Sequence, residues 1–178
     1  ISQNRWEQDK REVPNKITSI SAKEIGFSNS QTTADVLSSS GEVFVQKSQL
    51  GGGSPMIRGF STNRILIVVD GVRMNNAIYR SGNLQNVISL DANSIENMEV
   101  IFGPGSVIYG SDALGGVMDF HTLQTRLSES DKPEFKANAM TRYSSANNEK
   151  TGHFDFNIGL KKWSFLTSVS YSDFDDLR

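Results

Sequence analysis

The chain has 178 residues, no cysteine and a formal net charge of −2, and it begins without a methionine. Its length suits one or two domains with a buried core, and its near-neutral charge argues against a nucleic-acid binder. The missing thiols exclude a disulfide scaffold, a cysteine nucleophile and a cysteine zinc site. The longest aliphatic run, residues 65–69, is far shorter than the roughly 20 residues that a transmembrane helix needs. We expect a mature protein or a piece of one.

Two helix starts are visible in the first quarter of the chain. Ser21 and Glu24, and then Thr32 and Asp35, have the spacing of a capping box. The polar segment before them, residues 1–14, is expected to be an extended leader. Three short strands are predicted around these helices, at residues 15–20, 43–46 and 55–60. The glycine-rich stretch at residues 51–54 predicts a flexible loop.

Asp70 and Gly71 separate two runs that are rich in β-branched residues, at 65–69 and 72–74. This pair predicts a hairpin, because both turn residues must adopt positive φ. A polar loop is expected after it. The next predicted elements are a helical turn, a strand, a second turn and a strand, at residues 94–97, 98–102, 106–109 and 117–122. These elements indicate a mixed α+β domain with glycines at its corners.

The pattern changes after about residue 125. A polar linker leads to three segments in which apolar or aromatic side chains alternate with small or polar ones, at residues 135–143, 153–160 and 163–171. Such runs of about ten residues are typical of transmembrane β-barrel strands. They are equally compatible with a soluble antiparallel sheet that has one wet face. Three strands cannot close a barrel, so the barrel interpretation requires many further strands.

Catalytic and cofactor motifs do not emerge from the sequence. The glycine-rich segment 103–110 follows a predicted strand, but it lacks the spacing of a phosphate-binding loop, with Ile108 where a third glycine should be. The two histidines, His121 and His153, lie in different segments without a nucleophile motif. The acidic residues form no pair that the sequence can identify. We therefore expect no enzyme, no cofactor and no metal site.

Four pieces occur in a fixed order and spacing: PMIRGF, ILIVVDGVR, IENMEVIFGPGSVIYG and GGVMDF, which start at residues 55, 65, 95 and 115. Together they resemble the plug domain of TonB-dependent outer-membrane receptors, over about residues 12–123. The alternating strands after residue 133 then resemble the first strands of the receptor barrel. The resemblance implies an α+β plug followed by the start of an antiparallel transmembrane β-barrel, of about 22 strands when complete.

The resemblance also implies a division of the chain and a function. Residues 1–14 would be an extended leader after the TonB box, 15–125 the plug, 126–134 a linker and 135–178 the first, incomplete set of barrel strands. The protein would import a scarce, bulky nutrient such as a ferric siderophore or haem across the outer membrane of a Gram-negative bacterium. Its partners would be TonB, reached through a TonB box upstream of or at residue 1, outer-membrane lipid and the ligand.

Two groups of residues take roles from this resemblance. The substrate-binding candidates lie in the loops that would face outward: Asn63, Asn75, Asn76, Tyr79 and Arg80. The second group would hold the plug in the barrel. In the family, two arginines of the plug face glutamates of the barrel; Arg58 fills the first position, but Phe102 stands at the second. Either the lock has one arginine or its second contact is apolar.

Alternative functions remain open from the sequence. One is a glycan or cobalamin importer of the same family, the glycan importer working beneath a surface lipoprotein. Another is a soluble substrate-binding or adhesion module with no transport role.

Overall fold

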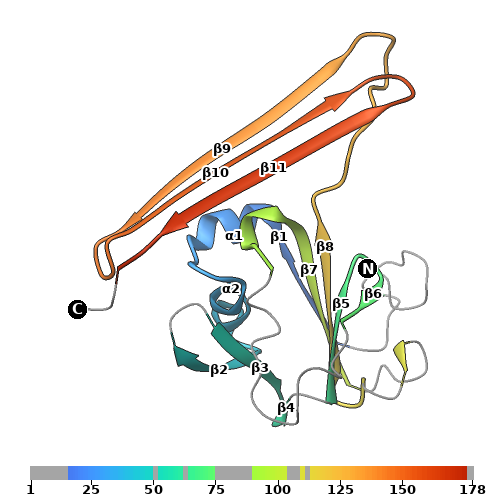
Figure 1. Cartoon of the computed structure of the whole chain (residues 1–178). Coiled ribbons are helices and arrows are strands. Elements are labelled where there is room, and N and C mark those ends of the chain that lie inside the picture. The colour runs from blue at the N-terminus through green and yellow to red at the C-terminus, as the bar shows by residue number, and fades with distance from the viewer. Residues whose placement is uncertain are drawn as a thin grey trace. The chain divides into compact units, whose positions relative to one another are not determined.

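The computed structural model describes residues 16–49, 52–61, 64–74, 90–103, 109–110 and 113–175. The chain divides into two compact units, Ile1–Thr122 and Leu123–Arg178 (Figure 1). The first unit mixes strands with short helices, and the second consists of three long strands. Among the described residues, no helix is long and apolar enough to cross a membrane.

A five-stranded sheet forms the centre of the first unit. Its strand order is β1-β7-β8-β5-β6, in which β5 and β8 run parallel and every other neighbouring pair is antiparallel. The sheet is therefore mixed, and β1 is one of its edge strands. The strands have the following bounds: β1 Ile17–Ser21, β5 Ile65–Val69, β6 Val72–Arg73, β7 Ile95–Phe102 and β8 Gly116–Thr122.

Two short helices follow β1, and both begin at a complete capping box. Ser21 and Glu24 cap helix α1 (Ala22–Ser28), while Thr32 and Asp35 cap helix α2 (Thr33–Ser39). The two predicted helix starts are confirmed. The predicted turn at 94–97 was wrong in its position, because Asp91 caps a 3-10 helix at Ala92–Ser94 and β7 begins at Ile95.

Both faces of the five-stranded sheet are packed. On one face, alternate residues of β7 (Met98, Val100 and Phe102) join a core with side chains of α1 and α2. On the other, Ile101 packs in a smaller cluster that includes Ala113. Covering both faces explains why β5 is an almost continuous apolar run rather than an alternating one.

A second sheet of the first unit consists of β2 (Phe44–Gln49), β3 (Gly52–Ile57) and β4 (Phe60–Ser61). The prediction of a flexible loop at 51–54 was wrong for Gly52–Ser54, which belong to β3. The reason lies at Gly53, where an added Cβ would be 2.3 Å from Cγ1 of Val45 and 3.2 Å from Cβ of Ala34. Glycine is needed here for close packing, not for flexibility.

Two tight hairpins have positive φ at both turn residues. Asp70 (φ 48°) and Gly71 (φ 79°) join β5 to β6, which confirms the predicted hairpin. Arg58 (φ 48°) and Gly59 (φ 83°) join β3 to β4 in the same way. Asp-Gly is a favoured pair for such a turn, whereas arginine is unusual in it.

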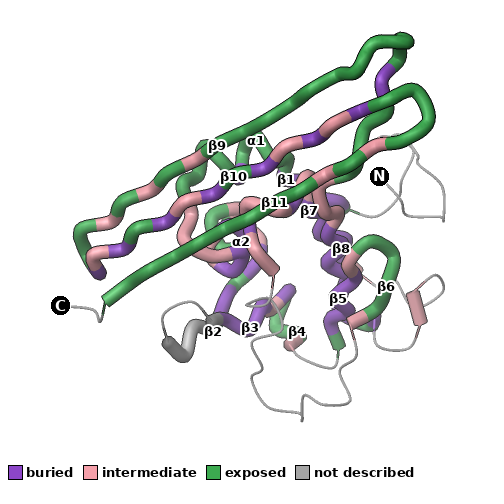
Figure 2. Tube along the Cα trace, turned by 45° about the horizontal axis from the view of Figure 1, so that its top comes forward, coloured by how far each residue is buried: buried purple, intermediate pink, exposed green. Residues whose placement is uncertain are grey.

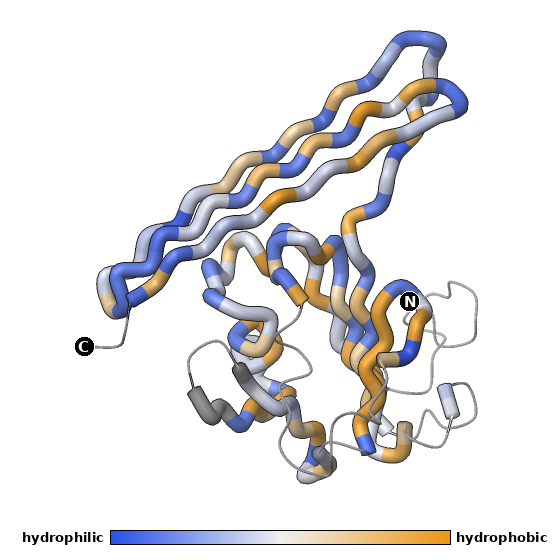
Figure 3. The backbone as a smooth tube through the Cα atoms, viewed as in Figure 1, coloured by the Kyte–Doolittle hydropathy of each residue, from blue (hydrophilic) through white to orange (hydrophobic). Residues whose placement is uncertain are grey.

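The second unit is an antiparallel sheet in the order β11-β10-β9. Its strands are β9 (Glu134–Ser144), β10 (Glu149–Gly159) and β11 (Ser164–Asp173). Burial alternates residue by residue along β10 (Figure 2), and hydropathy alternates with the same period (Figure 3), so that the buried positions of this strand carry mostly polar side chains and its apolar rings are more exposed. The register places apolar or aromatic side chains of all three strands on one face, among them Phe154, Ala139 and Val169.

The opposite face of this sheet is polar and extensively hydrogen-bonded. Arg142 pairs with Glu149, whose carboxylate also accepts a bond from Thr151 Oγ1 at 2.7 Å. Farther along β10, His153 Nδ1 lies 2.6 Å from Ser170 Oγ. The sequence pattern predicted one apolar and one polar face, and the structure adds the hydrogen bonds across the polar face.

Candidate functional site

The residues predicted to form the site divide into two groups in the structure. Asn63, Asn75, Asn76, Tyr79 and Arg80 lie outside the described residues. Arg58 and Phe102 are both described, and the fold brings them together although they are 44 positions apart in the sequence. The predicted turn at 106–109 also lies outside the described residues, apart from Tyr109.

Phe102 is the centre of a cluster of charges. It ends β7 with only 4% of its surface exposed. The guanidinium carbon of Arg58 and the ammonium of Lys16 each lie 5.5 Å from the centre of its ring. Both cations are within the distance at which the ring quadrupole attracts a positive charge. Phe102 therefore offers an aromatic platform to two cations.

Glu42 supplies the negative charge of the cluster. Its carboxylate accepts from Lys16 Nζ at 2.8 Å and from Thr18 Oγ1 at 3.2 Å. The pKa of Glu42 is lowered, chiefly by the hydrogen bond from Lys16 and further by the charges of Lys16 and Arg58. This carboxylate remains ionised at neutral pH and partly neutralises the two cations.

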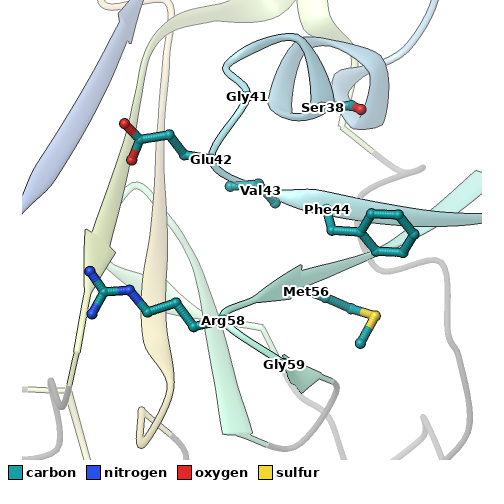
Figure 4. Close-up of a pocket in the computed structure, with 8 residues that line it drawn as sticks. All are labelled: Ser38, Gly41, Glu42, Val43, Phe44, Met56, Arg58 and Gly59. Carbon is teal, nitrogen blue, oxygen red and sulfur yellow. The ribbon is translucent and has the colours of Figure 1, made fainter.

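A shallow pocket of about 540 Å³ opens beside the cluster. Figure 4 shows Glu42 and Arg58 pointing to one side of this pocket and Phe44 and Met56 to the other. The pocket is thus charged on one side and apolar on the other. The described residues contain no group of three or more His, Cys, Asp or Glu side chains that could hold a metal ion.

The backbone links the cluster to the start of the chain. Lys16 directly precedes β1, and its carbonyl accepts a hydrogen bond from the N–H of Phe102 at 3.0 Å. Because Arg58 lies in the β3–β4 turn and Glu42 just before β2, the cluster joins the edge of the five-stranded sheet to the β2–β3–β4 sheet. The sequence resemblance identified Arg58 and Phe102; Lys16 and Glu42 were missed, since only the fold makes them neighbours.

A pair of acidic residues was also missed by sequence reasoning. Glu99 and Asp119 lie directly opposite each other on β7 and β8, and each has 4% of its surface exposed. His121 Nε2 lies 3.7 Å from Asp119 Oδ2, while Asn97 donates to Glu99 Oε1 at 3.3 Å. Finding this pair required the antiparallel register of β7 and β8.

The environment of this pair shifts two pKa values. Burial first, and then the charges of Glu99 and Asp70, raise the pKa of Asp119 to about 6, against the opposing charge of His121. Burial and the charges of Asp119 and Glu99 raise the pKa of Tyr109 to about 12. The tyrosine is therefore neutral at physiological pH, and Asp119 retains protons more readily than an exposed aspartate does.

Comparison with known proteins connects this architecture to one family. The family described as "TonB-dependent Receptor Plug Domain" matches residues 9–117. The vitamin B12 transporter BtuB of Vibrio vulnificus strain CMCP6 is 39% identical over 133 residues, which are 72% of this chain and 21% of the transporter. The BtuB of strain YJ016 is 37% identical over 69% of this chain and 20% of that protein. The chain thus spans about a fifth of these relatives.

Solved structures share the fold at lower sequence identity. The copper transporter OprC superposes with a TM-score of 0.74 at 21% identity, over 90% of this chain and 24% of that one. The siderophore receptor PirA from Acinetobacter baumannii gives a TM-score of 0.64 at 19% identity, over 93% and 25% of the two chains. Because these matches extend past residue 122, both the mixed-sheet unit and strands of the second unit have counterparts in such receptors.

Proposed function

Since the chain belongs to the TonB-dependent receptor family, we propose that it forms the plug and the first barrel strands of a receptor that actively imports a scarce, bulky nutrient. The receptor lies in the outer membrane of a Gram-negative bacterium, and its plug gates a barrel of about 22 strands. TonB engages the leader, through a TonB box at or upstream of residue 1, and supplies the energy. No chemical conversion of the nutrient is part of this function.

One observation supports this proposal most strongly. A plug-type mixed sheet is followed by strands that have one apolar face and one polar face. An exposed face with aromatic side chains suits lipid, and a hydrogen-bonded polar face suits the interior of a barrel. A soluble adhesion module has no need for rings such as Tyr171, which is 72% exposed, on an outward face. In the receptor interpretation, the apolar face contacts lipid and the polar face contacts the hydrated interior of the barrel.

The substrate is proposed to bind at the outward loops that carry Asn63, Asn75, Asn76, Tyr79 and Arg80. Arg80 suits an anionic ligand, and Tyr79 can stack on an aromatic one. A ferric siderophore or haem fits these residue types. Cobalamin is the second candidate, because the two curated relatives are named as vitamin B12 transporters. A glycan substrate would call for a surface lipoprotein as a further partner.

A binding panel distinguishes these substrates. The full-length receptor is purified in detergent and titrated with a ferric catecholate siderophore, haem, cyanocobalamin and an oligosaccharide. We expect one of the first three ligands to bind with micromolar or better affinity. Arg80→Ala and Tyr79→Ala should each lower the affinity for that ligand at least about tenfold. Binding of the oligosaccharide alone would contradict the proposed substrate class and favour a glycan substrate.

Arg58 is proposed to hold the plug to the barrel, with the ring of Phe102 as its platform. The ring orients the guanidinium, and Glu42 leaves it only partly neutralised, so a carboxylate of the barrel can pair with it. Arg58→Glu in the full-length receptor would reverse this charge and is expected to loosen plug docking and reduce uptake. Arg64→Glu is the matched control, because Arg64 contacts the ring of Phe60 instead. Unchanged docking and uptake in Arg58→Glu would contradict the proposal that Arg58 holds the plug to the barrel.

A further inference from the structure

The segment predicted as a linker, residues 126–134, is hydrogen-bonded to the β10–β11 hairpin. Arg126 N–H donates to Asn157 Oδ1 at 3.1 Å, and Asn157 Nδ2 donates to the carbonyl oxygen of Arg126 at 3.0 Å. One amide side chain thus satisfies both backbone groups of one residue, much as a neighbouring strand would. Ser164 Oγ adds a third bond, also to the carbonyl of Arg126, at 2.8 Å.

Further contacts continue this attachment toward β9. Ser128 N–H donates to the carbonyl of Leu160 at 3.2 Å, and Ser128 Oγ donates to the carbonyl of Lys132 at 2.6 Å. At the surface, Lys161 forms an ion pair with Asp131. The attachment to the hairpin therefore involves Arg126 and Ser128 through their backbone groups and Asp131 through its side chain, while the bond from Ser128 Oγ to Lys132 lies within the segment itself.

Gly159 provides the space for this attachment. A Cβ at this position would lie 2.5 Å from the carbonyl oxygen of Arg126 and 3.0 Å from the nitrogen of Ser128. Both neighbours are backbone atoms, which cannot move aside without opening the attachment. Asn157 and Gly159 are neighbours on the same face of β10, and both are buried. One residue holds the segment and the other leaves room for it.

We propose that Asn157 is a positioning residue that anchors the carboxyl end of the plug to the barrel wall. Strand β8 ends at Thr122, so only Leu123, Gln124 and Thr125 separate the plug from the anchored Arg126. This inference rests on the proposed function, because an anchor matters only if TonB pulls on the plug. It adds a device to that function: the anchor sets how far the plug can travel.

The length of chain between the plug and its first attachment to the hairpin decides the effect. Four Cα–Cα steps from Thr122 to Arg126 can span at most about 14 Å, at roughly 3.3–3.6 Å per residue. Without the anchor, the connecting chain would extend to Glu134, where β9 begins, and its twelve steps would span about 40 Å. With the anchor closed, force on the leader must rearrange the plug internally. With it open, the plug can shift as a body.

The test uses the full-length receptor and three variants. Asn157→Ala removes the two amide bonds, and Gly159→Ala blocks docking of the segment without removing any polar group. Asn138→Ala is the matched control, because Asn138 lies on the same polar face but bonds Asp155 rather than Arg126. Amide hydrogen exchange of the resting receptor in detergent is measured first, at residues 126–132.

We expect exchange at Arg126 and Ser128 to accelerate at least about tenfold in Asn157→Ala and Gly159→Ala, and to stay unchanged in Asn138→Ala. Uptake in energised cells should fall at least about threefold in the first two variants, with ligand binding within twofold of the parent. Unchanged exchange in either Asn157→Ala or Gly159→Ala would overturn the anchor itself. Faster exchange with normal uptake would overturn its role in transport.

Failure of the proposed function gives a different result. A receptor that imports none of the candidate nutrients in any variant, yet shows the expected exchange pattern, retains the anchor and loses the transporter assignment. If Asn157→Ala does not fold, Gly159→Ala and Ser164→Ala carry the same comparison. Ser164→Ala removes the hydroxyl that bonds both the carbonyl of Arg126 and Oδ1 of Asn157.

Discussion

Arg58 stands at a position that its side chain does not favour. Its left-handed backbone costs a residue with a Cβ about 1 kcal/mol or more, and glycine would fit the turn without strain. Its contact with the ring of Phe102 repays part of this cost. A strained arginine beside a charged pocket is better explained by a binding role than by the stability of the plug.

Arg58→Gly separates these two explanations. Because the substitution relieves backbone strain and loses one cation–π contact, we expect the free energy of unfolding of the plug to stay within about 1 kcal/mol or to rise. Uptake by the full-length receptor should fall all the same. Chemical denaturation combined with uptake measurements checks this, and a large loss of stability with normal uptake would contradict it.

Asp119 carries a pH dependence. Its pKa is about 6 in the folded plug against 3.8 for an exposed aspartate, since burial and Glu99 disfavour the ionised form. A raised pKa of an acid means that its contribution to stability is fully present below about pH 4 and is lost as the pH rises through about 6. The carboxyl group then destabilises the neutral-pH plug by about 1–3 kcal/mol.

We therefore expect Asp119→Asn to stabilise the plug above pH 7 and to change little at pH 4. Denaturation of the full-length receptor between pH 4 and 8 measures this, with Glu129→Gln as the control, since Glu129 is exposed on the surface. A gain in stability that is the same at every pH would show that the effect is not one of ionisation.

At the scale of elements, capping and turn chemistry were readable from the sequence, and close packing was not. Ser21-x-x-Glu24 and Asp70-Gly71 predict their local geometry from the sequence alone, because the contacts that determine it lie within four residues. Gly53 looked like part of a flexible loop, since the chain that excludes its Cβ comes from β2 and α2. Lys16 and Glu42, and likewise Asn157 and Arg126, meet only through tertiary contacts.

A pair of glycine substitutions tests this distinction. Gly53→Ala forces a Cβ to within 2.3 Å of Val45 and should destabilise the plug by about 2 kcal/mol or more. Gly26→Ala, in helix α1, meets nothing within 4 Å and should stabilise the plug by about 0.5–1 kcal/mol. Urea denaturation of both variants measures the two signs. Equal effects would mean that packing does not explain Gly53.

For the whole molecule, the alternation of β9–β11 was predictable because a period of two is a local property. Its meaning was not, since a lipid face and a wet face of a soluble sheet can share one pattern. The family match and the superposed receptors support the lipid-facing meaning, which is part of the proposed function. The outward loops that would name the substrate lie outside the described residues, so the substrate remains a proposal.

The proposed lipid face makes a quantitative prediction. Val169 lies near the middle of β11 on the apolar face and is 60% exposed. Val169→Lys should destabilise the folded receptor in lipid vesicles by about 2–4 kcal/mol. Ser168→Lys, on the opposite face of the same strand, should cost clearly less. Equal costs, or a cost that is the same without lipid, would favour a soluble sheet.

The most direct test of the central claim is the dependence of uptake on TonB. Cells that express the full-length receptor are given the labelled nutrient that it binds, with TonB present or deleted and with or without a protonophore. The account predicts accumulation only with TonB and an energised membrane, while surface binding persists in all four conditions. Accumulation that continues without TonB, or binding that is never followed by accumulation, would contradict it.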